Sequence, residues 1–229
     1  MKRQQGFTLA EVLITITIIG VISALTLPGI QANTAANRNR AALKNTMSIL
    51  SQIAQSNMAT QGWNFSNITD ICSTTADARA HSVENDNYSI CAMMNSNLTG
   101  ETNLGIIGQG RPDGNTYRYV NTIAPSGNYV GYLLSNGAIV GLETSLSGNN
   151  CQENNNNNCH GFIDVNGLAG PHREITCQNG NIARLWPNGD RTSTCTIERN
   201  TNADIFPIKY HGSTIELASD AARSFLNAR

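Results

Sequence analysis

Residues 6–28 read GFTLAEVLITITIIGVISALTLP, and this stretch decides how the rest of the chain is organised. From Phe7 to Leu27 it is an apolar run that would span about 31 Å as a helix, enough to cross the hydrocarbon core of a bilayer. Glu11 interrupts the run, although a carboxylate costs ~2.5–3.5 kcal/mol near the bilayer midplane and less toward a helix end. The sequence therefore predicts a membrane helix in which Glu11 requires a partner.

The composition restricts what the rest of the chain can be. The 229 residues leave room for one globular domain besides the apolar helix. Fifteen Lys and Arg against 16 Asp and Glu, with no basic stretch interleaved with aromatics, exclude the usual footprint of a nucleic-acid-binding protein. No nucleotide-binding loop, zinc-protease motif or nucleophile elbow is present, and the four histidines are scattered, so we expect no enzyme.

Beyond Leu27 we expect the helix to be interrupted at Pro28 and Gly29. A helical period then returns and predicts an amphipathic helix at 33–60, ending before Gly62. Its apolar stripe consists of Leu43, Met47, Leu50 and Ile53. We expect this stripe to pack on the chain's own sheet, because such stripes usually belong to the core.

Strand signals follow in the second half of the chain. The segment 129–143, YVGYLLSNGAIVGLE, places Asn-Gly between two apolar runs and predicts an antiparallel hairpin. GFIDVNG at 161–167 predicts a strand and a turn, and 115–123 alternates like a strand. In the final segment, 213–229, a short helix is expected with Ile215, Ala218, Ala222 and Phe225 on one side. The predicted fold class is α+β, a long helix packed on a small antiparallel sheet.

The six cysteines all follow the apolar run, which together with their even number indicates an oxidising compartment. Fifteen pairings are possible, and closeness alone suggests Cys72 with Cys91, Cys151 with Cys159, and Cys177 with Cys195. The last pair would tie the base of a small projecting hairpin, and the first would close an Asn-, Ser- and Thr-rich loop. Zinc ligation by three of these cysteines with His160 fits no usual spacing, so disulfides are favoured.

The opening segment, KRQQGFTLAEVLITITIIGVISALTLP, resembles the processing and assembly segment of type IV pilins and of the pseudopilins of type II secretion. The resemblance consists of a basic leader ending in Gly6, Phe7 directly after it, Glu11 four residues later, and Pro28 at the end of the apolar helix. GFIDVNGLAGP and DIFPI look like a C-terminal pattern of pilin-like proteins.

This resemblance implies three parts. Residues 1–6 are a leader that a prepilin peptidase removes, with N-methylation of the new terminus at Phe7. Residues 7–29 are the transmembrane and polymerisation helix, and 30–229 are a pilin-like globular domain that includes the helix at 33–60. The expected location is the inner membrane, with a cytoplasmic N-terminus and a single pass, and then an extracytoplasmic filament.

The resemblance also implies a function and partners. The chain would be a structural subunit of a pilus or pseudopilus, and its partners would be other pilin subunits, the prepilin peptidase and an inner-membrane assembly platform. Cleavage creates an α-amino group on Phe7 that can pair with Glu11 of a neighbouring subunit in a low-dielectric helix bundle. Two alternatives stay open: a minor subunit at the filament tip, and a membrane-anchored binding domain that never polymerises.

Calcium is the one ligand that the resemblance suggests, since some pseudopilins carry a calcium site in a C-terminal loop. Asp164, Asn166 and Asp204 are the candidate ligands. An EF-hand beginning at Asp164 would need an acidic residue at its twelfth position, where Ile175 stands. A plain turn at Asn166 and Gly167 is the favoured interpretation, and no other cofactor is expected.

Overall fold

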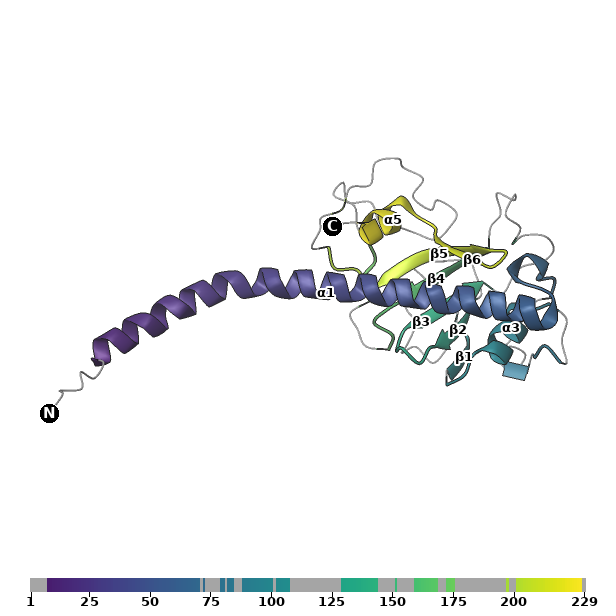
Figure 1. Ribbon diagram of the computed structural model, residues 1–229, viewed down its shortest axis with the longest axis horizontal. Helices are drawn as coiled ribbons and strands as arrows, with labels where there is room; N and C mark the ends of the chain where they lie inside the picture. The colour runs from purple at the N-terminus through teal and green to yellow at the C-terminus, as the bar shows by residue number, and fades with distance from the viewer. Residues whose placement is uncertain are drawn as a thin grey trace.

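In the computed structural model, one long helix carries a globular part at its C-terminal half, and its N-terminal half extends away from that part (Figure 1). The residues that the structure describes are 8–70, 72, 79–80, 82–84, 88–100, 102–107, 129–143, 151, 159–168, 172–175, 197 and 201–227. The expected strand at 115–123, the projecting hairpin at 177–195 and its two cysteines, and the leader therefore lie outside the described residues.

Helix α1 (Leu9–Gln61) is 53 residues long and continuous, so the expected interruption at Pro28 and Gly29 is wrong. A proline removes one backbone N–H and crowds the preceding turn, which bends a helix but need not end it. The apolar segment before Pro28 and the amphipathic segment after it both favour a helix. Figure 1 shows α1 as one gently curved helix. Gly62 ends the helix at φ +81°, as the sequence predicts.

The globular part is built on a six-stranded antiparallel sheet whose strands follow one another in sequence order, from β1 to β6. Each strand therefore pairs with its neighbours along the chain, which confirms the α+β class. The strands are β1 (Thr102–Ile106), β2 (Tyr129–Leu133), β3 (Ile139–Glu143), β4 (Cys159–Asp164), β5 (Ile205–His211) and β6 (Thr214–Leu217).

The predicted hairpin at 129–143 is confirmed as β2 and β3, with Tyr132 opposite Val140. The turn bonds Gly137 N to Leu134 O at 2.9 Å, and Leu134 N to Ala138 O at 2.8 Å. Gly137 takes the positive φ of +84°, whereas Asn136 uses its side-chain oxygen to accept from Ala138 N. The Asn-Gly pair therefore works through two different properties, an amide acceptor and a left-handed glycine.

The apolar stripe of α1 packs on one face of the sheet, as predicted. Leu43 and Leu50 are fully buried, and they join residues such as Tyr132 and Phe206 in the main core. Short helices fill the ends of this layer: η1 (Phe65–Asn67), α3 (Ile90–Asn97) and α5 (Asp220–Asn227). Figure 1 shows α1 crossing the sheet, with α3 near its far end and α5 near the point where the exposed half of α1 begins.

The expected terminal helix over 213–229 is wrong in its first part. Thr214–Leu217 form β6, in which Ile215 and Leu217 are buried while Thr214 faces solvent. Ile215 pairs with Tyr210 of β5, so sheet hydrogen bonds replace the helical ones. The spacing of Ile215 to Ala218 fits a helix and the spacing of Ile215 to Leu217 fits a strand, and the strand is favoured because it completes the sheet.

Two of the three suggested disulfides lie within the described residues and are confirmed. Cys72 and Cys91 are linked with a Cα–Cα separation of 6.3 Å, and Cys151 and Cys159 with 4.9 Å. All four are buried. Each bridge restricts the unfolded chain, and the first ties Cys72 to α3.

The sheet face opposite α1 carries a second, smaller core in which glycines make room for large side chains. A Cβ on Gly141 would overlap the Phe162 ring, and a Cβ on Gly131 would lie 2.7 Å from Ile107. Phe162 and Ile107 are both fully buried in this second cluster. The glycines at these sheet positions are therefore required by packing rather than by backbone conformation.

Replacing Gly141 by Val should destabilise the folded domain by ~1–3 kcal/mol or more, because the new side chain and the Phe162 ring need the same space. Thermal unfolding of the detergent-solubilised full chain measures the change. Thr102→Val on the exposed start of β1 is the control and should leave the Tm nearly unchanged. An unchanged Tm for Gly141→Val would contradict the packing described here.

Candidate functional site

The first candidate site is the N-terminus of α1, where Thr8 and Glu11 form a capping box. The Glu11 carboxylate accepts from Thr8 N at 2.8 Å and from the Thr8 hydroxyl at 2.9 Å, through the same oxygen, Oε2. In return, Glu11 N donates to Thr8 Oγ1 at 3.3 Å. Within one chain, the hydrogen-bond partner of the Glu11 carboxylate is thus Thr8, at the start of the same helix. Gly6 and Phe7 lie outside the described residues.

The helix segment that follows is suited to a membrane. Among the described residues, Leu9–Leu27 is the one helix segment long and apolar enough to span a bilayer, and none of it is buried in the protein. Its threonine hydroxyls bond to carbonyls three or four residues earlier, as Thr15 does to Val12 and Thr17 to Leu13. These hydroxyls are therefore satisfied inside the helix, and Glu11 is the one charged group of the segment.

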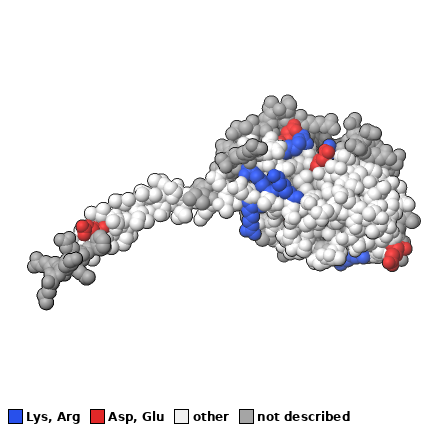
Figure 2. Space-filling model, in the orientation of Figure 1, with Lys and Arg blue, Asp and Glu red and all other residues white. Residues whose placement is uncertain are grey.

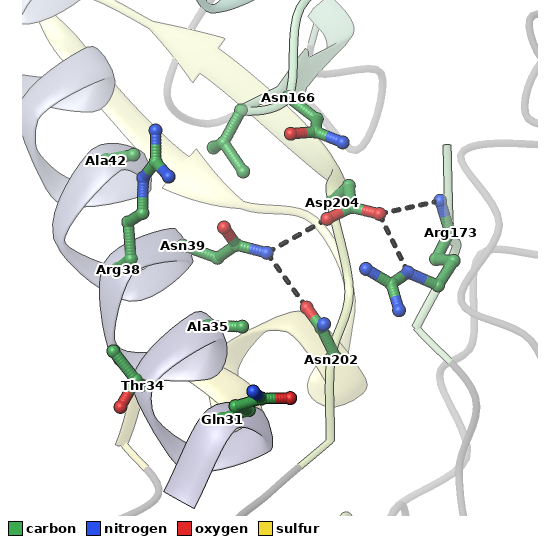
Figure 3. Close-up of a pocket in the computed structure, with 11 residues that line it drawn as sticks. Gln31, Thr34, Ala35, Arg38, Asn39, Ala42, Asn166, Arg173, Asn202 and Asp204 are labelled. Atoms are coloured by element: carbon green, nitrogen blue, oxygen red, sulfur yellow. Dashed lines mark hydrogen bonds and ion pairs between the residues drawn. The ribbon is translucent and has the colours of Figure 1, made fainter. Parts of the chain in front are cut away.

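A second candidate site is a pocket of about 410 Å³ between α1 and the chain segments beside β4 and β5 (Figure 3). One face of α1 supplies six of its residues, at positions three or four apart. They are Gln31, Thr34, Ala35, Arg38, Asn39 and Ala42. The other wall consists of Val165, Asn166, Arg173, Asn202 and Asp204.

Asp204 is the only acid among the described residues that line the pocket, and its carboxylate is surrounded by donors. Its side chain is 2% exposed. Oδ1 accepts from Asn39 Nδ2 at 2.9 Å, and Oδ2 accepts from Arg173 Nε at 3.0 Å and from Arg173 N at 3.2 Å. Figure 3 shows Asn39 and Arg173 reaching Asp204 from opposite sides, so the carboxylate joins α1 to the segment around 173.

Asp164, at the end of β4, makes the corresponding link to His172. Its side chain is fully buried, Oδ2 lies 2.6 Å from His172 Nδ1, and Oδ1 accepts from Asn166 N at 3.0 Å. Burial raises the pKa of Asp164 to about 6, while the neighbouring His172 acts in the opposite direction. The two carboxylates together hold residues 172 and 173 against the sheet.

The three candidate calcium ligands are thus close together, since Asp164 and Asp204 influence each other electrostatically and Asn166 lines the same pocket as Asp204. Their carboxylate oxygens already have protein partners in His172, Asn166 N, Asn39 and Arg173. Calcium takes six to eight oxygen ligands at about 2.3–2.6 Å, so it would have to displace a histidine and an arginine. The calcium site stays a prediction, and the simple turn at Asn166 is compatible with the geometry.

Because the carboxylates are occupied by nitrogen donors, millimolar calcium should leave the Tm of the full chain unchanged relative to chelator. Differential scanning of both samples at neutral pH is the measurement. The opposite result would be a rise in Tm with calcium that Asp164→Asn or Asp204→Asn removes, and it would establish these residues as calcium ligands. A matched magnesium sample separates specific binding from ionic strength.

Sequence reasoning missed two features of these sites. Thr8 could have been found, because Thr-x-x-Glu ahead of an apolar run is the signature of a capping box. Asn39 and Arg173 could not, because their role depends on a partner, Asp204, that is far away in the sequence.

Comparisons with known proteins address the first of the two sites. A family model described as the prokaryotic N-terminal methylation motif matches residues 1–27. Among curated proteins and solved structures, none matches the chain significantly. The matched segment includes Gly6, Phe7 and the Thr8–Glu11 capping box and implies processing by a prepilin peptidase. The first 27 residues therefore carry the prepilin-type signature of type IV pilins and pseudopilins.

Proposed function

We propose that the chain is a structural subunit of a type IV pilus or pseudopilus that is cut after Gly6, methylated at Phe7 and assembled through α1. The observation that carries this proposal is the methylation motif at residues 1–27, whose residues from Leu9 onward form the first part of a 53-residue helix. The exposed apolar half of that helix suits a membrane first and a bundle of identical helices afterwards. Its other half is fixed to the sheet.

The chemistry of assembly depends on a charge that processing creates. In the uncut chain, Thr8 satisfies the Glu11 carboxylate through one oxygen, Oε2. Cleavage after Gly6 places an ammonium group on Phe7, next to that capping box. In a bundle of helices, this ammonium of an arriving subunit can approach Glu11 of a subunit already in place, and the low dielectric strengthens the pair. Glu11 would then set the axial register between subunits.

The location and partners follow from the same proposal. The subunit would wait in the inner membrane with its N-terminus in the cytoplasm, and then leave it as part of an extracytoplasmic filament. An inner-membrane assembly platform and other pilin subunits would be its partners. The disulfides Cys72–Cys91 and Cys151–Cys159 support an oxidising location for the globular part.

Co-expression with a prepilin peptidase should shorten the chain by its leader and leave methylated Phe7 at the terminus. Gly6→Leu should stay at full length, because the peptidase cuts after a small residue at that position. Intact-mass spectrometry distinguishes the products. A wild-type chain that keeps its leader, or that is cut near Ala32 as a secretory signal would be, rejects the proposed processing.

Glu11→Gln should be inserted and processed normally but should be absent from sheared filaments in a strain where this chain is the only copy of its kind. Glutamine keeps a side-chain acceptor for Thr8, so the capping box survives while the charge is lost. The incoming ammonium would then be buried without a counter-ion, at a cost of ~3–5 kcal/mol. Immunoblotting of filament and membrane fractions provides the measurement.

Thr8→Ala is the matched control, because it removes the capping hydroxyl and leaves the carboxylate. It should cost ~0.5–2 kcal/mol of helix stability and still allow assembly. If Glu11→Gln assembled normally, the charge pairing would be refuted. If neither wild type nor variant formed filaments although both were anchored, the alternative of a binding domain that does not polymerise would be favoured. Low stoichiometry in purified filaments would instead favour a tip subunit.

A further inference from the structure

The pocket beside α1 has a charge that no described residue of the chain compensates. Its lining contains two cations, Arg38 and Arg173, and one anion, Asp204. Asp204 is paired with Arg173 and accepts an additional bond from Asn39. Arg38 is exposed and, within the described part of the chain, forms no hydrogen bond or ion pair. The pocket therefore offers one positive charge in a recess whose other walls combine amides, a threonine and small apolar side chains with the Arg173–Asp204 pair.

This arrangement suits a carboxylate that comes from outside the chain. A guanidinium binds a carboxylate through two parallel hydrogen bonds, and Figure 3 shows the side chain of Arg38 extending along the wall formed by α1. Asp204 does not compete for Arg38, because its oxygens are already occupied. The walls are formed by a helix and by segments fixed to strand ends, so the recess exists before any partner arrives.

The position of the pocket indicates the kind of partner. Arg38 lies near the place where α1 enters the globular part. Figure 2 shows Lys and Arg side chains gathered there with acidic side chains close by, and a further acidic group at the opposite end next to a basic one. Glu84 belongs to that opposite end. The neighbouring Val83 N donates to Ser96 Oγ on α3 at 3.1 Å, and Asn97 of α3 bonds to Asn57 near the end of α1 at 3.0 Å.

Glu84 has the properties of the missing partner. It is exposed, and in the described residues it makes no hydrogen bond or ion pair. Along α1, Arg38 and Asn57 are separated by about 28 Å, so the basic recess and the acidic group are at opposite ends of one globular part. They cannot meet within one chain, but two copies with the same orientation, displaced along the helix axis, bring them together.

We infer that the pocket around Arg38 is a subunit interface that receives the Glu84 carboxylate of a second copy of this chain. The inference rests on the proposed function, since a filament holds its subunits in one orientation. It adds a second electrostatic contact between subunits. This contact joins the globular parts, whereas the pairing at Glu11 joins the N-terminal halves of the helices. Together the two contacts would fix both the membrane-side and the outer end of each subunit against its neighbours.

A charge exchange tests the inference in full-length protein, in a strain where this chain is the only copy of its kind. Arg38→Glu and Glu84→Arg should each reduce the amount of subunit in sheared filaments about tenfold or more, because like charges would meet in the interface. The double variant Arg38→Glu with Glu84→Arg should recover most of that loss. Lys44→Glu is the control, because it reverses an exposed charge on α1 outside the pocket and should assemble normally.

A second measurement guards against indirect effects. Arg38→Cys and Glu84→Cys in one chain should give covalent oligomers on mild oxidation of filaments, and neither single variant should do so beyond a dimer. Processing at Phe7 confirms that each variant reaches the membrane. Normal incorporation of Arg38→Glu, or a double reversal no better than the single ones, overturns the inference, including the case in which the pocket binds a lipid headgroup or another anion. If wild type formed no filament, the proposed function itself would fail.

Discussion

The packing of the C-terminal half of α1 on the sheet is the interaction on which the rest of the structure depends. Leu43 and Leu50 are buried between the helix and strands β2 to β6, so the direction of the helix is fixed by the globular core. Because α1 is continuous, the same contact also sets the direction of the exposed segment, Leu9–Leu27, which extends away from the domain. A helix that ended at Pro28 would let the two parts rotate independently. Because the helix is continuous, the membrane segment and the globular domain move as one body.

Two buried carboxylates attach the segment 172–175 to the helix and the sheet. Asp204 connects Asn39 on α1 to Arg173, and Asp164 connects the end of β4 to His172. Breaking such a pair leaves a buried charge without a partner, which costs more than the pair itself contributes. Their value is therefore positional: they hold the segment 172–175 beside β5, where Arg173 O also accepts from Asp204 N and Ile205 N. The wall of the pocket is built in this way.

How much the sequence could predict depended on how local each signal was. The apolar run, the stripe with Leu50 and the turn at Gly137 are encoded by neighbours in the chain, and each was predictable. The continuation through Pro28 was not, since the surrounding helix overrides a local breaker. Ile215 was assigned to a helix because a segment as short as Thr214–Leu217 fits the period of a helix as well as that of a strand. Only the pairing with β5 decides for the strand. The partners of Asp204 required the fold, since contacts between distant segments leave no spacing to read.

The capping box at Thr8 and Glu11 makes the start of α1 independent of everything before it. All of its hydrogen bonds are made by residues 8 and 11. Cutting after Gly6 would leave a single residue ahead of Thr8 and would break none of these bonds. On the proposed function, removal of the leader would therefore add a charge next to a helix start whose hydrogen bonds stay in place.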